Sequence, residues 1–123
     1  MDAHHLADLC DRTDWIEASI GLQFSQDEPE LQDAFGRVAV LQHRIDHRAR
    51  THELPFPTFA TRLSLSETEQ QIVMLLVAMR ARPDVRSRIQ QRIGAAELSL
   101  DAIRTLIYGS QPSRLALREL SSD

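Results

Sequence analysis

The first half of the chain shows a helical pattern of apolar positions, which Asp-Glu-Pro interrupts at residues 27–29. Before this break, apolar positions recur every three or four residues, as expected for an amphipathic helix. This first stripe consists of Leu6, Leu9, Thr13, Ile16, Ile20 and Phe24. A second helix is predicted over about residues 30–50, and its stripe consists of Leu31, Phe35, Val38, Leu41 and Ile45. Because the link is short, the two helices are expected to form an antiparallel hairpin.

A second group of helices is predicted from residue 54 onward. Pro55 and Pro57 favour an extended backbone, and residues 58–63 are expected to form one or two helical turns. Ser66 and Glu69 have the spacing of a capping box, in which each side chain accepts a hydrogen bond from the other residue's backbone amide. The helix that they open is expected to be the central buried one, because apolar residues cover most of its circumference. These residues are Ile72, Val73, Leu75, Leu76 and Met79.

Proline and glycine mark the limits of the following helix. Pro83 suits the first position of a helix over residues 83–93, and Gly94 is expected to close it in the left-handed conformation. Further helices are predicted from Ser99 and over residues 112–120. Since alternating strand patterns are missing, the predicted fold class is all-α.

The predicted helices divide the chain into two parts. Residues 1–53 form an acidic helical hairpin, and residues 54–123 form a compact helical bundle. The two parts are expected to share one core, because 123 residues correspond to one ordinary domain.

Charge is distributed unevenly, although the net charge of −4 is small. Residues 1–35 contain nine of the 18 acidic side chains but only one of the 14 basic ones, which are all arginines. The chain is therefore acidic at its start and basic afterwards, and its net charge does not indicate a nucleic-acid binder. The acids of the first helix are expected to form a solvated face, which comprises Asp8, Asp11, Asp14 and Glu17.

Two sets of arginines are candidate contact residues. The first set surrounds the helix over 83–93 and is the candidate surface for an acidic protein partner: Arg80, Arg82, Arg86, Arg88 and Arg92. The acidic first helix of a second copy is one such partner. The other set lines the second helix and provides the alternative nucleic-acid contacts: Arg37, Arg44 and Arg48. Acid-first pairs four residues apart, such as Asp84 and Arg88, also suit an ordinary solvated helix.

Histidines on the second helix have a spacing that metal ligands use. His43 and His47 share one helix face, with Asp46 between them. A catalytic zinc site needs a third ligand, for which His52 is the nearest candidate. A solvated histidine face is the favoured interpretation, so that no metal or other cofactor is predicted.

Several functional classes lack their sequence patterns. The uncharged run over residues 70–79 is far shorter than the ~20 apolar residues of a membrane-spanning helix. The N-terminus lacks the basic start and apolar run of a signal peptide, and the single cysteine, Cys10, fits a reducing compartment. A cytoplasmic location is therefore predicted. There is no Gly-Lys-Ser/Thr and no evident nucleophile with a base, so no enzymatic activity is expected.

The order of elements from Leu54 onward carries a family resemblance. The segments LPFPTFATRLSLSETEQQIVMLLVAMRARPDVRSRIQQRIG, LSLDAIRTLIYG and PSRLALREL follow one another. They resemble the N-terminal region of a group of bacterial AAA+ ATPases, some of which accompany contractile injection systems. In that region a helical hairpin and a variant winged-helix domain precede the ATPase module. The matching features are a helix start at residues 65–69, an apolar helix, the helix from Pro83 and the short helix from Ser99.

The resemblance implies an adaptor or assembly module that recognises a protein: the motor's substrate, an adaptor or another copy of the chain. The β-wing and the Walker motifs would then lie beyond Asp123. Two alternatives remain open, a DNA-binding winged-helix-like module and a small metal-dependent enzyme that uses His43, Asp46 and His47.

Overall fold

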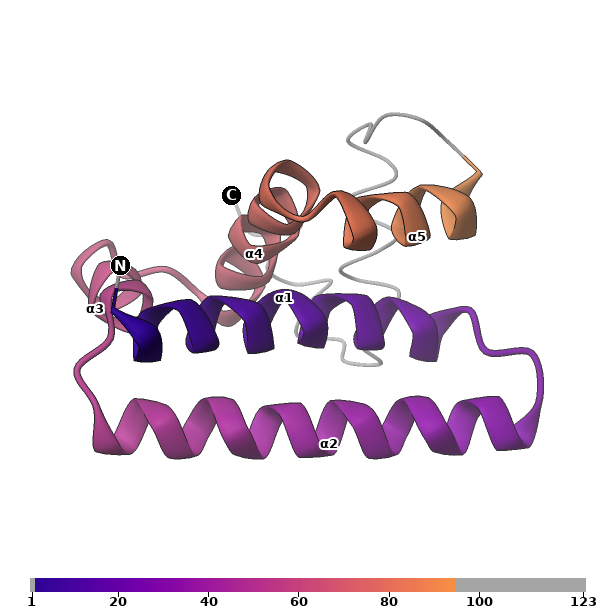
Figure 1. Ribbon diagram of the computed structural model, residues 1–123, viewed down its shortest axis with the longest axis horizontal. Coiled ribbons are helices and arrows are strands. Elements are labelled where there is room, and N and C mark those ends of the chain that lie inside the picture. Colours follow the sequence, from indigo (N-terminus) through magenta and orange to yellow (C-terminus); the bar gives the residue numbers. More distant parts are fainter. Residues whose placement is uncertain (1, 95–123) are drawn as a thin grey trace.

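A computed structural model describes residues 2–94 of the chain, and within this range it consists of α-helices and connecting loops without a strand. The all-α prediction is confirmed, with a helical hairpin packed on a group of shorter helices (Figure 1). The helices are α1 (Ala3–Gln23), α2 (Glu28–Thr51), α3 (Pro55–Arg62), α4 (Glu67–Ala81) and α5 (Pro83–Ile93).

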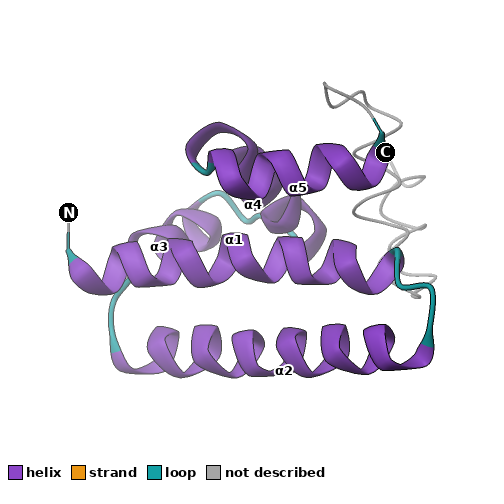
Figure 2. Ribbon diagram, turned by 45° about the vertical axis from the view of Figure 1, so that its right-hand side comes forward, coloured by secondary structure: helices purple, strands orange, loops and turns teal. Residues whose placement is uncertain are grey.

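The hairpin consists of α1 and α2, which run antiparallel side by side in both views (Figures 1 and 2). Asp27 caps α2, because its side chain accepts a hydrogen bond from the backbone N–H of Glu30 at 2.9 Å. Pro29 lies in the first turn of α2, where a missing N–H costs nothing. The break at residues 27–29 thus ends the loop and starts the second helix.

Local signals place the start of α4 and both ends of α5 correctly. The capping box is present, since Ser66 Oγ accepts from Glu69 N at 3.0 Å and a Glu69 carboxylate oxygen accepts from Ser66 N at 2.8 Å. Pro83 begins α5, and Gly94 closes it with a φ of 68°. In contrast, α3 begins at Pro55. The two prolines predict an extended backbone at this point and a helical segment only from residue 58.

The main core lies between α1 and the group of α3, α4 and α5. Its buried residues are Ile16, Ile20, Phe56, Met74, Leu75, Ala78, Val85 and Ile89. Leu41 and Ile45 of α2 are buried as well. Helix α1 therefore forms the middle layer, with α2 on one side and α4 and α5 on the other (Figure 1).

Three apolar residues of the predicted stripes are exposed. Leu76 is 49% exposed, whereas its neighbour Leu75 is fully buried. The expected burial of Leu76 is wrong because α4 buries the face that carries Met74, Leu75 and Ala78. Phe35 of α2 is 57% exposed and Leu6 of α1 is 53% exposed, since α2 packs on one side only and Leu6 lies in the first turn of α1.

The predicted helices from Ser99 and over residues 112–120 lie outside the described residues. Among the described helices, none has the length and apolar character that a membrane span requires.

Candidate interaction surfaces

The acidic residues of α1 lie between helices. Asp8 is fully buried and Asp11 is 3% exposed, while Asp14 and Glu17 are partly buried. The prediction of a solvated acidic face is therefore wrong. Because α1 is the middle layer, its polar positions also meet neighbouring helices.

Asp8 pairs with Arg12 one turn further along α1. The Nε of Arg12 donates to both carboxylate oxygens of Asp8, at 3.0 and 2.9 Å. The guanidinium carbon of Arg12 lies 5.0 Å from the ring centroid of Phe56 in α3, which is within the range of a cation–π contact. This neutralised pair therefore connects α1 with α3.

Asp11 connects α1 with α2. Arg44 Nη2 and Arg48 Nη1 each donate to one of its carboxylate oxygens at 2.8 Å. Arg44 and Arg48 are two of the three alternative nucleic-acid contacts, and both are thus engaged within the chain. The third, Arg37, is exposed.

Arg82 connects the α4–α5 corner with α1. Its Nη1 donates to Asp14 Oδ1 at 2.6 Å, to Thr13 Oγ1 at 3.0 Å and to the Cys10 carbonyl at 3.3 Å. Burial disfavours the charge of Arg82, but the hydrogen bond to Asp14 and the Asp14 charge outweigh it and raise the pKa of Arg82. Its side chain is 25% exposed, so little of it remains for a partner.

Two further arginines of α5 reach acidic residues of the hairpin. Arg88 donates to Glu17 from Nε at 2.7 Å and from Nη2 at 2.9 Å, a bidentate geometry. The hydrogen bond with Glu17 raises the pKa of Arg88 above its ordinary value. Arg92 lies 3.9 Å from Glu30, a longer and more exposed pair.

The charge asymmetry of the sequence is thus used largely within the fold. Of the five candidate contact arginines, Arg82, Arg88 and Arg92 pair with acids of the hairpin in the same chain. Arg80 and Arg86 are exposed, and neither forms an ion pair with another residue of the range 2–94. Three of the five candidate arginines are thus directed to acids of the hairpin, and the other two are exposed. Their role as a contact surface stays a prediction.

Among residues 2–94, no third potential ligand joins the histidines of α2. His43 and His47 are exposed, with 6.4 Å between their ring centroids, and Asp46 accepts a hydrogen bond from the Gln42 amide at 2.9 Å. His52 instead lies against His4, at 3.7 Å between centroids. In the part of the chain that is described, no group of three or more potential metal ligands is present.

Helix α3 has an exposed apolar face that is not among the surfaces predicted from the sequence. Pro55 and Phe59 are four residues apart and lie on one side of this short helix, and Leu63, the residue that caps its end, follows at the same interval. Phe59 is 47% exposed and Leu63 is 55% exposed. Phe56 and Ala60, also four apart, face the core instead. In the sequence, two apolar series with a spacing of four residues indicate that the segment has a second apolar side besides the buried one. We call the exposed series of Pro55, Phe59 and Leu63 the α3 apolar face.

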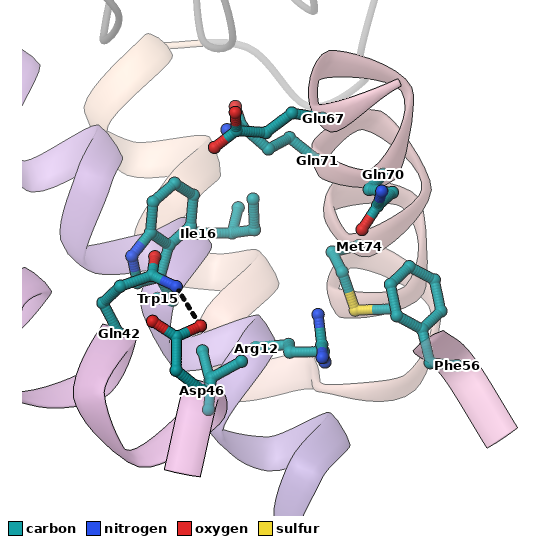
Figure 3. A pocket seen from close by; sticks show the side chains of 11 residues that line it. Arg12, Trp15, Ile16, Gln42, Asp46, Phe56, Glu67, Gln70, Gln71 and Met74 are labelled. Carbon is teal, nitrogen blue, oxygen red and sulfur yellow. Dashed lines mark hydrogen bonds between the residues drawn. The ribbon is translucent and has the colours of Figure 1, made fainter. Parts of the chain in front are cut away.

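A pocket of about 390 Å³ lies between the hairpin and helices α3 and α4. Trp15 and Ile16 of α1 lie across it from Met74 of α4, with Glu67 and Asp46 toward different ends (Figure 3). The remaining lining residues are Arg12, Gln42, Ile45, Phe56, Gln70 and Gln71. The pocket thus combines apolar walls with several polar side chains, as ligand sites do.

Comparison with known proteins identifies one family. The family model described as "Winged helix domain, variant" matches residues 2–121. No curated protein and no solved structure matches the chain.

Proposed function

The chain belongs to the family of variant winged helix domains, and from this we propose that it is a non-catalytic protein-interaction module, the N-terminal adaptor or assembly part of an AAA+ ATPase. The ATPase setting comes from the resemblance of residues 54 onward to the N-terminal regions of such motors. A motor of this kind works where ATP is abundant, and a chain with one cysteine suits the reducing cytoplasm.

The α3 apolar face is the observation that carries the interaction role. Exposed apolar residues are common singly, but several on one side of a helix are typical of a contact site. Phe59 is a suitable anchor, because aromatic side chains are enriched at the energetic centres of interfaces. The charged side chains, in contrast, mainly connect α1 to its neighbours.

The test has two parts, of which the first concerns the ATPase setting. The source gene is sequenced past the codon for Asp123. We expect an open frame that continues into a Gly-x-x-x-x-Gly-Lys-Ser/Thr segment, the phosphate-binding loop of such motors. A stop codon directly after Asp123 would contradict the ATPase setting.

The second part concerns the α3 apolar face. The Phe59→Asp/Leu63→Asp variant of the whole encoded protein is expected to assemble at least tenfold more weakly, because a charge at an interface anchor costs about 2 kcal/mol or more. Sedimentation velocity measures the assembly. Val40→Asp is the matched control, since Val40 is 57% exposed on a different helix. Equal assembly of the double variant and the control would refute this role of the face.

DNA binding is the second candidate, because the winged-helix family and the exposed Arg37, Arg80 and Arg86 favour it. We expect no measurable binding of a duplex at about 50 mM salt, since Arg44 and Arg48 are held by Asp11 and each phosphate contact needs an available cation. Fluorescence anisotropy with a labelled duplex measures this. Binding that weakens steeply as salt rises, and that is lost in Arg80→Glu/Arg86→Glu, would favour the DNA-binding function instead.

A further inference from the structure

We infer that the pocket between the hairpin and helices α3 and α4 binds a basic peptide segment of a partner protein, with an arginine side chain as its anchor. This inference rests on the proposed interaction role and adds the chemistry of the partner. It does not depend on the ATPase setting. Its basis is the set of charges, hydrogen-bond acceptors and apolar walls that meet at the pocket (Figure 3).

The uncompensated charge of the pocket is negative. Among the described residues that line it, the one cation is Arg12, which the buried Asp8 neutralises at 2.9 Å. Asp46 and Glu67 also line the pocket, and neither has an ion-pair partner among residues 2–94. A positively charged group is therefore the electrostatic complement of this site, because the two carboxylates, one toward each end of the pocket, have no counter-charge among the described residues.

The amides at the pocket add acceptors to these carboxylates. Gln42 Nε2 donates to Asp46 at 2.9 Å, and Gln70 Nε2 donates to the Leu65 carbonyl at 3.2 Å. Each of these amides thus uses one of its two N–H groups inside the chain, and each also has a carbonyl oxygen that accepts hydrogen bonds. A guanidinium has five N–H donors and no acceptor, so it matches this set better than the compact ammonium of lysine.

The walls suit the rest of an arginine residue. Trp15, Phe56 and Met74 provide apolar surface on which the aliphatic part of the side chain packs while its head reaches polar groups. The volume of about 390 Å³ lies within the range of known ligand pockets, about 300–1,000 Å³.

The experiment uses Trp15 as its reporter, because it is the single tryptophan of the chain. The full chain is titrated with acetyl-Gly-Leu-Arg-Leu-Gly-amide and with the same peptide carrying citrulline, which has the shape of arginine without its charge. We expect a saturable change in tryptophan fluorescence with the arginine peptide and at least tenfold weaker binding of the citrulline peptide.

Variants connect the binding to the two carboxylates. Asp46→Asn/Glu67→Gln is expected to bind the arginine peptide at least tenfold more weakly. Asp33→Asn/Glu53→Gln changes the net charge equally at exposed residues outside the pocket, and it is expected to bind like the unmodified chain. Far-UV circular dichroism confirms that both variants are folded.

Three results would overturn the inference: no fluorescence change with the unmodified chain, equal affinity for the two peptides, or equal weakening in both double variants. The Phe59→Asp/Leu63→Asp variant separates this inference from the proposed function, since neither residue lines the pocket. If that variant loses assembly while no peptide binds, the pocket inference alone fails. If peptide binds and assembly is unchanged, the role of the α3 apolar face fails.

Discussion

Replacing Arg12 with methionine is expected to lower the free energy of unfolding by about 3–5 kcal/mol, because it leaves a buried carboxylate without its counter-charge. Asp8 is fully buried, and among the described residues its ion pair is with Arg12 alone. The variant also loses the cation–π contact with Phe56. Urea denaturation, followed by far-UV circular dichroism, measures the change through the midpoint at constant slope.

The double variant Asp8→Leu/Arg12→Met is the control for this prediction. It removes both charges and fills the space with apolar side chains, which is often neutral for stability when a buried pair is replaced. We therefore expect it to recover most of the loss. A loss below about 1 kcal/mol for Arg12→Met alone would mean that the pair behaves like an ordinary surface ion pair.

Replacing Leu75 with alanine is the second large effect, with an expected loss of about 2–5 kcal/mol. Leu75 is fully buried in the main core, in the same cluster as Val85 and Ile89 of α5. Truncation removes apolar contacts and leaves a cavity, because the core includes residues from four helices that cannot all move inward. The same denaturation measurement determines the loss.

Leu76→Ala is the matched control, since it makes the same chemical change one residue further along α4. Leu76 is 49% exposed, so we expect a loss within about 0.5 kcal/mol, as for surface positions in general. Similar losses for the two variants would show that Leu76 is buried in solution and that the orientation of α4 differs from the one described.

The helix limits could be predicted where a single residue has a strong local preference. The capping box of Ser66 and Glu69 and the left-handed Gly94 depend on backbone groups only a few residues away. Helix α3 starts earlier than its prolines predict, because prolines favour an extended segment before them while Pro55 also fits a first helical turn.

The candidate surfaces were less predictable, because they depend on which helix faces remain uncovered. Phe35 and Leu41 belong to the same predicted stripe, yet Phe35 is 57% exposed and Leu41 is 4% exposed. Likewise, Phe56 and Phe59 lie three residues apart, and only Phe56 is buried. Apolar periodicity indicates that a helix has an apolar side, but the position of the neighbouring helices decides how much of that side is buried.

The sequence by itself determined the all-α class, the hairpin and the excess of acids before arginines, since these follow from periodicity, caps and composition. Only the tertiary structure decided how the charges are used. Asp11 and Glu17 both belong to α1, which lies between α2 and the α4–α5 pair. Asp11 pairs with Arg48 of α2, and Glu17 pairs with Arg88 of α5. These partners are 37 and 71 residues apart in the chain. No local pattern relates them, because ion pairing between helices depends on their packing.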